Sequence, residues 1–382
     1  MRLCSVAHLF YPDGGFDVFG LRDLCIRMTR MGDEVSVVTW ACSRPRRTVD
    51  RFDGIEVHRL RGINVTLLPT IAQYPYLFGL AETISTVKPD AILCNSHLFL
   101  PSLQAMAAGR SLGIPTVVIN HGLVAKRGLV TDLSQWGYLL SVGRRYVRRA
   151  DCVVCLTNHD KQRMERFGLA SRVEVIPNGV DLTAFRPAKE KDPNVVTWVG
   201  RMVPEKGLVH LLQAASLVIK EHPGLRIQFV GGGPLLPELK AQASRLGISQ
   251  NCSFLGWKSE AEVAAILSRS SIFAIPSLSE GLPKALLEAM ACGDAIVGSD
   301  INQIEEVVDH GRQALLCDAT NHQKLADNLL ACLEDPALTR RLGAASRLLA
   351  EQRFSIEVTA RRYHELIDQL VHSSLRKVEI QS

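Results

Sequence analysis

Short runs of apolar, mostly β-branched residues alternate with helix-like patterns along this chain, and the alternation limits its fold more than any other feature. The first run, RLCSVAHLF, is followed by a helical pattern from Phe19 to Met31 and then by EVSVVTW. DAILCNS, PTVVINHG, DCVVCLT and VEVIPN continue the series, each after a helix-like segment. Continuous apolar strands between helices are typical of a parallel sheet covered on both faces. The first part of the chain therefore predicts an α/β domain.

A polar segment rich in Pro, Asn and Gly, IPNGVDLTAFRPAKEKDPN, interrupts this series. The pattern then restarts with VVTWVGR, RIQFVGGG, CSFLGW, SIFAIPS, AIVGSD and ALLCD, and it is helical from Pro336 onward. A break followed by a second complete series predicts a hinge and a second doubly wound domain. The length of 382 residues also exceeds one typical core. Ligands in such sheets bind beyond the carboxyl ends of the strands, so two facing domains predict a cleft between them.

Several classes of protein are disfavoured by the same sequence. No apolar run approaches the roughly 20 residues of a membrane span. The start MRLCSVAHLF enters a strand-like run and is followed by the turn YPDGG instead of a cleavage site, so we expect a cytoplasmic protein. The ten cysteines are scattered through apolar runs, which argues against a disulfide framework. Cys152 and Cys155 lie in one strand-like run and point to opposite faces, which disfavours a redox or zinc role.

The net charge of +5 comes entirely from the first half of the chain. Residues 1–180 contain 22 Lys and Arg against 15 Asp and Glu, whereas the remainder contains 22 against 24. This asymmetry points to an anionic partner for the first domain. The segment QWGYLLSVGRRYVRRADC joins aromatic and aliphatic residues to four arginines, and a further basic cluster lies at Arg44, Arg46, Arg47 and Arg51. The segment fits a helix on an anionic membrane surface or a pocket for a lipid phosphate; an internal helix with solvated arginines is the alternative.

The stretch SLSEGLPKALLEAMACG, residues 277–293, places two carboxylates around the start of a predicted helix. Pro283 can open this helix because its missing N–H costs nothing there, and Gly281 allows close approach of a ligand to the backbone. The amides around Gly281, Leu282 and Lys284 then form an anion site at the positive end of the helix dipole. Glu280 lies on its rim and Glu288 one to two turns further along.

The spacing of Glu280 and Glu288 suits a ligand with hydroxyl groups on both sides of a phosphate, because carboxylates are good acceptors for sugar hydroxyls. The alternative makes Glu280 a residue favoured by the helix dipole and Glu288 a solvated helix residue. Glu288 stands in LLEAMA, where a charge without a partner would be costly, and this favours the functional interpretation.

Two cations follow the strand-like run VVTWVGR. Arg201 ends the run and Lys206 stands in the next loop. Together they can neutralise a diphosphate, Arg as a bidentate fork and Lys as a point charge, although two solvated loop charges remain the alternative.

Glycine-rich loops follow two further strands. FVGGGPLL brings Gly231 and Gly233 to a strand end, but Leu236 occupies the third glycine position of a dinucleotide fingerprint, which disfavours a nicotinamide enzyme. Gly14 and Gly15 follow the first strand, either at a ligand or in a plain turn.

His121 ends a buried strand in VVINHGL and is predicted to project toward a ligand, although a structural histidine is the alternative. His8 and His97 are placed similarly, and no nearby acids complete a metal-ligand pattern. The sequence has no Asp-x-Asp motif, so we expect no metal and assign its charge-neutralising role to Arg201 and Lys206.

Together these residues resemble the family-4 retaining glycosyltransferases of the GT-B fold over nearly the whole chain. The resemblance rests on the Gly14-Gly15 loop, HGL at 121–123, IPNGVD, VGRMVPEKG, VGGGP, FLGW and the Glu-x7-Glu motif. It implies two Rossmann-like domains across a cleft: an acceptor domain at 1–180 and a donor domain at 181–354. FSIEVTARRYHEL resembles the family's last helix, so residues 355–382 are expected to pack back on the first domain.

The resemblance also implies roles for individual residues. Arg201 and Lys206 would bind the donor diphosphate, Glu280 the transferred sugar and Glu288 the ribose. The remaining implied site residues are Gly256 and Trp257 at the base, His121 at the reacting carbon, and Gly14 and Gly15 at the phosphate. Three departures from the family pattern affect sugar or acceptor choice: the segment around Asn302 and Gln303, Asn95 in place of a frequent histidine, and Phe16 with Asp17.

The sequence therefore predicts a retaining, metal-independent hexosyltransferase that uses a UDP- or GDP-sugar as its nucleotide-sugar donor. Its acceptor would be a glycan, a lipid-linked molecule or a small molecule. The expected location is the cytoplasm, with peripheral contact at the anionic inner face of the cell membrane, and no nucleic-acid partner is expected. A GT-B-like nucleotide-sugar epimerase and a noncatalytic nucleotide-sugar-binding protein are the alternatives.

Overall fold

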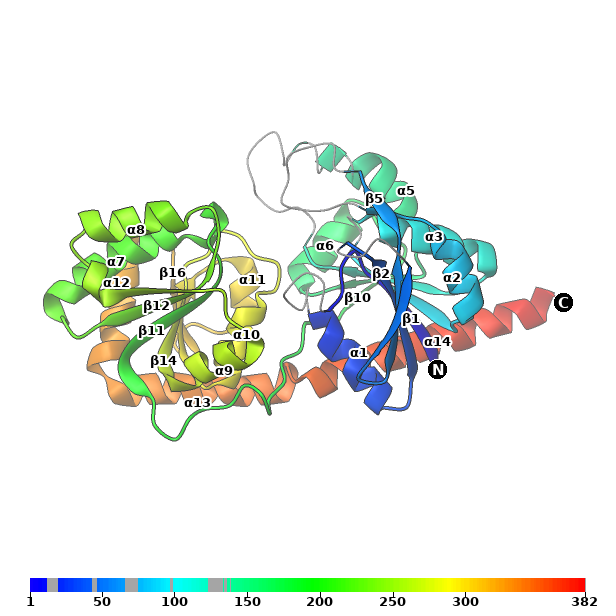
Figure 1. Cartoon of the computed structure of the whole chain (residues 1–382). Helices are drawn as coiled ribbons and strands as arrows, with labels where there is room; N and C mark the ends of the chain where they lie inside the picture. The colour runs from blue at the N-terminus through cyan, green and yellow to red at the C-terminus, as the bar shows by residue number, and fades with distance from the viewer. Residues whose placement is uncertain are drawn as a thin grey trace. The chain divides into compact units, whose positions relative to one another are not determined.

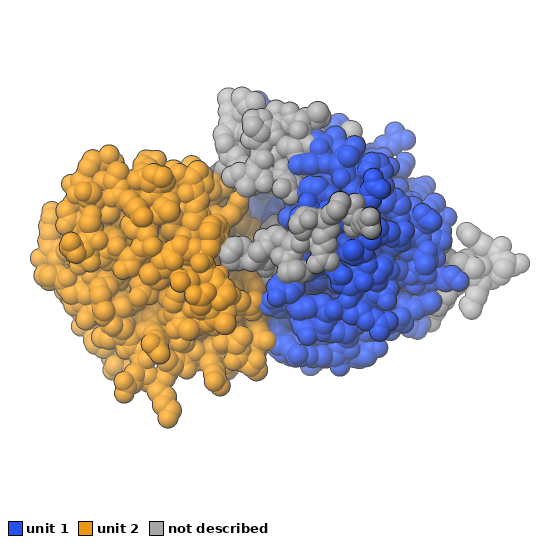
Figure 2. Space-filling model, in the orientation of Figure 1, with its two compact units in different colours: residues 1–124, 128–179, 356–382 blue, residues 125–127, 180–355 orange. Residues whose placement is uncertain are grey.

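The computed structural model describes residues 1–11, 20–42, 47–65, 75–96, 99–122, 133, 136–137 and 139–381. The chain divides into two compact units, each described by itself (Figure 2). Unit 1 takes in the chain up to Gly179 and again from Ile356, and unit 2 contains Val180–Ser355. The predicted boundaries after residues 180 and 354 lie within one residue of these crossings.

Unit 1 is built on an eight-stranded sheet in the order β10-β9-β8-β7-β1-β2-β4-β3, in which only β3 runs antiparallel. The strands are β1 Arg2–Val6, β2 Glu34–Trp40, β3 Thr48–Phe52, β4 Ile55–Leu60, β7 Ala91–Asn95, β8 Thr116–Asn120, β9 Cys152–Cys155 and β10 Val173–Val175. A separate hairpin pairs β5 Gly62–Asn64 with β6 Pro75–Leu77. The sequence predicts β1, β2 and β7 to β10 but not β3, β4 or this hairpin, which follow no helix-like segment.

The helices of unit 1 are α1 Leu21–Arg30, α2 Leu80–Val87, α3 Leu100–Leu112, a π-helix Leu139–Gly143, α5 Arg144–Val147, α6 Asn158–Arg166 and α14 Ile356–Gln381. Many side chains of this sheet are β-branched or contain sulfur, and they share one core. Those buried in it include Cys4, Val6, Val38, Ile92, Cys94, Val118 and Val153. Full burial of a valine or isoleucine side chain stabilises the fold by roughly 1.5–3 kcal/mol. The strands of this sheet therefore supply much of the core of unit 1.

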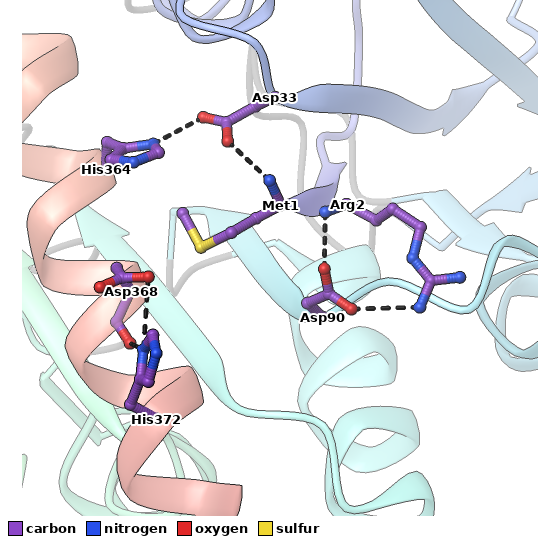
Figure 3. Close-up of polar contacts among 7 residues, drawn as sticks. All are labelled: Met1, Arg2, Asp33, Asp90, His364, Asp368 and His372. Carbon is purple, nitrogen blue, oxygen red and sulfur yellow. Dashed lines mark hydrogen bonds and ion pairs between the residues drawn. The ribbon is translucent and has the colours of Figure 1, made fainter.

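Helix α14 is the last element of the chain, yet it belongs to unit 1 and packs on α1 (Figure 1). Its buried face includes side chains that recur every three or four residues: Ile356, Ala360, Tyr363, Ile367 and Leu370. The buried carboxylate of Asp33 accepts hydrogen bonds from the Met1 ammonium at 3.0 Å and from His364 Nδ1 of α14 at 2.8 Å (Figure 3). The prediction that the last helix returns to the first domain is confirmed.

Unit 2 is built on a six-stranded parallel sheet in the order β13-β12-β11-β14-β15-β16. All six strands are predicted by the sequence. They are β11 Asp192–Arg201, β12 Arg226–Gly232, β13 Cys252–Gly256, β14 Ser270–Ile275, β15 Ala295–Ser299 and β16 Ala314–Cys317.

Helices cover both faces of this second sheet, with α7, α8 and α12 on one face and α9, α10 and α13 on the other (Figure 1). The helical elements are a 3₁₀ turn Pro204–Lys206, α7 Leu208–Glu221, α8 Leu236–Arg245, a 3₁₀ turn Ser249–Asn251, α9 Glu260–Arg269, α10 Lys284–Ala291, α11 Asn302–Glu305, α12 His322–Glu334 and α13 Pro336–Arg353. Trp198 and Phe229 are fully buried in the core beneath them. This is the doubly wound arrangement expected for a ligand site at the carboxyl ends of the strands.

Candidate functional site

The topology of unit 2 singles out the carboxyl ends of β11 and β14. These strands are neighbours, yet β12 and β13 extend the sheet on one side while β15 and β16 extend it on the other. The strand order therefore reverses between β11 and β14, and in open α/β sheets ligands bind at such a switch point. Arg201 is the last residue of β11, the loop after this strand carries Lys206, and the loop after β14 carries Glu280.

Backbone contacts hold these two loops together. The Leu278 amide donates to the Glu205 carbonyl at 2.8 Å. Gly207 has φ +64°, and a Cβ there would lie 1.9 Å from the Pro276 carbonyl oxygen. Only glycine fits at such a distance, so this residue fixes the close approach of the β11 and β14 loops.

Lys206 and Glu280 form an ion pair across the switch point. Lys206 Nζ lies 2.6 Å from both Glu280 Oε1 and Glu280 Oε2, and Ser277 Oγ donates to Oε1 at 2.7 Å. The side chains of Lys206 and Glu280 are 19% and 7% exposed. Removing either partner of such a shielded pair would leave an uncompensated charge. The sequence placed both residues at one edge of the sheet but did not predict their direct contact.

Glu288 lies inside α10 and is buried, with Lys284 one turn earlier at 3.8 Å from its Oε1. The sequence argument for a ligand role of Glu288 assumed a buried carboxylate without a partner, and this lysine supplies a partner from the same helix. Pro283 was predicted to be the first residue of the helix, but the structure makes it the N-cap, with extended backbone at ψ 115°, so the helix begins at Lys284. Gly281 and the buried Leu282 lie between Glu280 and this N-terminus, as predicted.

The neighbouring strand ends carry the other predicted residues of unit 2. Arg201 is exposed at the end of β11. Gly231 and Gly233 have positive φ, and a Cβ would meet the carbonyl oxygens of Gly200 at 1.9 Å and Met202 at 2.5 Å, respectively. These glycines allow the end of β12 to pack closely against the backbone on either side of Arg201.

Trp257 follows β13 on the same edge of the sheet and is 52% exposed. Gly256 before it has φ +69°, and nothing lies within 4 Å of a Cβ built there. At neighbouring Gly232, in contrast, a Cβ would meet the Trp257 indole nitrogen at 2.9 Å. The indole therefore lies over the end of β12 and presents an aromatic surface beside the glycine loop.

His121 belongs to unit 1, at the end of β8. Its Nε2 lies 2.6 Å from Oδ1 of the buried Asn95, which ends the adjacent strand β7. Both residues line a pocket together with Gly20, Asn178, Thr359 and Tyr363. His8, at the end of β1, stacks on Phe99 at 3.7 Å, and burial lowers the pKa of its imidazole to about 4, so this ring is neutral at pH 7. Gly14, Gly15 and His97 lie outside the described residues.

The described residues contain no cluster of three His, Cys, Asp or Glu side chains that could hold a metal ion. Cys152 and Cys155 are buried free thiols, and desolvation raises the pKa of each to about 12, which makes them poor nucleophiles and ligands. Over the part of the chain described here, no helix is long and apolar enough to span a membrane.

Comparisons with known proteins decide the family. A family model described as "Glycosyl transferases group 1" matches residues 181–349, and one described as "Glycosyltransferase Family 4" matches residues 20–184. This chain belongs to glycosyltransferase family 4. The predicted family is thereby confirmed, and the chain is a glycosyltransferase.

Two relatives and one solved structure illustrate what this glycosyltransferase is similar to. The alpha-maltose-1-phosphate synthase of Mycolicibacterium smegmatis is 30% identical over 296 residues, which are 69% of this chain and 76% of the relative. The D-inositol 3-phosphate glycosyltransferase of Rhodococcus erythropolis is 29% identical over 376 residues, 91% of this chain and 84% of the relative. Among solved structures, HepE of Anabaena in complex with UDP and glucose superposes with a TM-score of 0.75 at 20% identity, covering 97% of this chain and 100% of that one. The predicted GT-B fold is confirmed.

Two contacts of candidate site residues, one in each unit, were not predicted from the sequence. Ser277 contacts Glu280, and Asn95 contacts His121. Asn95 was noted only as a departure from the family pattern. Ser277 follows a buried strand by two residues, and a hydroxyl at the carboxyl end of such a strand is the signal that could have drawn attention to it.

Proposed function

We propose that this glycosyltransferase moves a hexose from a UDP- or GDP-sugar to a glycan, lipid-linked or small-molecule acceptor, with retention of anomeric configuration and without a metal ion. The observation that carries the proposal is the Lys206–Glu280 pair at the switch point. Arg201 ends β11, the strand that precedes the loop with Lys206. Two cations that can bind a diphosphate and one carboxylate that can bind a sugar therefore lie at the same edge of the sheet. The match to a fold that binds UDP and glucose in HepE supports the same ligand class.

The chemistry assigned to these residues follows from charge. Cleavage of the bond between the anomeric carbon and the diphosphate oxygen leaves a nucleoside diphosphate and an oxocarbenium-like sugar. Arg201 and Lys206 would stabilise the negative charge that develops on the leaving group. The acceptor oxygen forms its bond to the anomeric carbon on the same face, and its proton goes to an oxygen of the departing diphosphate. Because the Lys206 ammonium has three N–H donors, it can contact a phosphate oxygen while still holding Glu280.

Carboxylates and aromatic surface would position the rest of the donor. Glu288 is proposed to accept hydrogen bonds from the ribose, with Lys284 compensating its charge at the start of α10. Trp257 and Gly256 would border the base, since the indole offers an exposed stacking surface beside the glycine loop. Glu280 serves as a sugar ligand and not as a nucleophile in this scheme, and His121 would face the reacting carbon.

The test is a thermal-shift and turnover screen of UDP-, GDP- and ADP-sugars, each with and without EDTA. A donor that binds the folded protein raises its melting temperature, by an amount set by the ratio of ligand concentration to Kd. We expect one nucleotide class to stabilise the protein, and the sugar of that donor to be hydrolysed slowly at a rate that EDTA leaves unchanged. Loss of turnover in EDTA would contradict the metal-independent mechanism.

An acceptor assay with a radiolabelled donor sugar separates transfer from the alternative activities. Label that moves to an acceptor supports the transferase. Conversion of the donor to its epimer with no label transferred would identify an epimerase, and stabilisation without either reaction would identify a noncatalytic binding protein. Each of these two results would overturn the proposed transfer.

We further propose that unit 1 contacts an anionic membrane surface, such as the inner face of a cell membrane. Strands β5 and β6, together with the residue that follows each of them, expose four apolar side chains: Ile63, Val65, Tyr76 and Phe78. Helix α5 and the residues after it expose four arginines: Arg144, Arg145, Arg148 and Arg149. Helix α5 and strand β6 both pack against α3. Apolar residues beside basic ones are the combination that binds anionic lipid surfaces.

Vesicle co-sedimentation measures this contact. We expect binding to vesicles that contain phosphatidylglycerol, weaker binding to neutral phosphatidylcholine vesicles, and a loss of binding as salt is raised. Replacing Arg145 and Arg149 by Gln should weaken binding at least tenfold, because each surface cation contributes about 1 kcal/mol. Leu348→Ser alters an equally exposed apolar side chain of unit 2 and should leave binding unchanged. Equal binding to both kinds of vesicle would contradict the electrostatic part of the proposal.

A further inference from the structure

The carboxylate of Glu280 is held asymmetrically. Within the described part of the chain, it accepts hydrogen bonds from two side chains, Lys206 and Ser277. The lysine ammonium lies at the same 2.6 Å from both oxygens, so it does not distinguish them. The Ser277 hydroxyl, at 2.7 Å, donates to Oε1 only. Oε1 therefore accepts two hydrogen bonds and Oε2 one.

This asymmetry decides which oxygen can receive a further donor. Each carboxylate oxygen has about two acceptor sites, so Oε1 is satisfied by the lysine and the serine, whereas Oε2 retains one site. The terminal torsion of a glutamate is broad and roughly two-fold, and rotation about it would exchange the two oxygens. A flexible lysine that contacts both oxygens equally does not set this torsion. The serine does, because it bonds one oxygen alone.

Ser277 is well placed for this role. It follows the end of β14 by two residues, and its side chain is fully buried, with an exposed fraction of 0%. A buried hydroxyl cannot exchange its partner for bulk water, so its hydrogen bond holds the charged oxygen in place. Because Ser277 lies next to the end of β14, its hydrogen bond fixes the carboxylate relative to this strand.

We propose that Ser277 is a positioning residue that fixes the plane of the Glu280 carboxylate, so that Oε2 accepts a hydrogen bond from one hydroxyl of the transferred sugar. This inference rests on the proposed function, because it assigns a sugar ligand to Glu280. It goes further by naming the oxygen atom that binds the sugar and the residue that selects it. Ser277 itself touches no reacting atom.

The test compares donors that have and lack single sugar hydroxyls. The parent nucleotide-sugar and its monodeoxy analogues are turned over by wild type, Ser277→Ala, Ser277→Thr and Ser277→Cys, and kcat/KM is measured for each pair. We expect wild type to disfavour one deoxy donor by roughly 10- to 150-fold, the range set by a hydrogen bond to a charged group. Ser277→Ala should lower kcat/KM for the parent donor about tenfold or more while barely changing the deoxy donor, so the ratio collapses.

The other two variants test the hydroxyl itself. Ser277→Thr retains the donor and should keep the discrimination, whereas Ser277→Cys is nearly isosteric but a weak donor and should lose it. Binding of UDP and GDP, which lack the sugar, is measured by calorimetry and should be equal in all four proteins. This nucleotide reference shows that the donor domain of each variant is folded.

The outcomes separate this inference from the function on which it rests. If wild type turns over a nucleotide-sugar but Ser277→Ala and Ser277→Cys keep the full discrimination, the role of Ser277 is overturned and the transferase stands. If both variants lose parent and deoxy donors in equal proportion, Ser277 is merely structural, and the inference is again overturned. If wild type binds and turns over no nucleotide-sugar, the proposed function fails and this inference fails with it.

Discussion

Arg201→Ala should lower kcat/KM for the nucleotide-sugar by about 10²- to 10³-fold, the loss typical of removing one preorganised group that stabilises a developing negative charge. The fold should be unaffected. Arg201 is exposed at the end of β11, and in the described part of the chain its guanidinium has no hydrogen-bond or ion-pair partner. Turnover and thermal unfolding of the same preparation check both expectations. Arg201→Lys, which keeps the charge and loses the bidentate fork, should recover part of the activity.

The matched control for Arg201 is Arg226→Ala. Arg226 is also an exposed arginine of the same sheet, but it begins β12 at the amino edge, where it pairs with Asp192. Its removal should change neither turnover nor binding of the nucleotide. Equal losses in the two variants would show that the general positive charge of unit 2 matters and not the position of Arg201, which contradicts the assigned diphosphate contact.

Gly207→Ala should destabilise unit 2 by about 2–5 kcal/mol. A left-handed backbone conformation costs an alanine roughly 1–2 kcal/mol, and forcing extra atoms into a packed site costs a further 1–3 kcal/mol or so. The added Cβ would lie 1.9 Å from the Pro276 carbonyl oxygen and force apart the loops that carry Lys206 and Glu280. The midpoint of urea unfolding should therefore fall, and nucleotide-sugar turnover should fall with it.

Gly256→Ala separates the two contributions. Gly256 has φ +69°, close to the +64° of Gly207, but nothing lies within 4 Å of the Cβ position. This variant should therefore show only the conformational cost, roughly 1–2 kcal/mol. If Gly207→Ala proves no less stable than Gly256→Ala, the close packing of the β11 and β14 loops is wrong.

The parallel strands could be predicted from the sequence because they are buried on both faces. PTVVINHG and SIFAIPS each contain a continuous apolar run, and they form β8 and β14 in the structure. The strands that the sequence did not predict lack such a run. Strand β4, Ile55–Leu60, is buried, but Glu56, His58 and Arg59 interrupt its apolar residues. In β3, Thr48–Phe52, partly exposed positions alternate with exposed ones at the edge of its sheet, and β5 is a three-residue strand without a core of its own. Neither produces an apolar run.

The candidate site was predictable as a collection of residues but not as a set of contacts. Arg201, Lys206 and Glu280 each follow a buried strand, and parallel strands share one carboxyl edge, so the sequence placed them together. It could not show that Lys206 bonds both oxygens of Glu280, since 74 residues separate them and the contact depends on strand order. A serine is common in any loop, and only the 2.7 Å distance to the carboxylate distinguishes Ser277.

The return of α14 to unit 1 has a consequence for the synthesis of this protein. The ribosome makes most of unit 1 first, then all of unit 2, and only then Ile356–Gln381. Asp33 meets His364 across 331 residues of sequence, so this contact cannot form while unit 2 is being translated. Domains usually fold in the order in which they are made. Here unit 2 can complete its fold during translation, whereas the surface of unit 1 that α14 covers stays open to chaperones until α14 has left the ribosome.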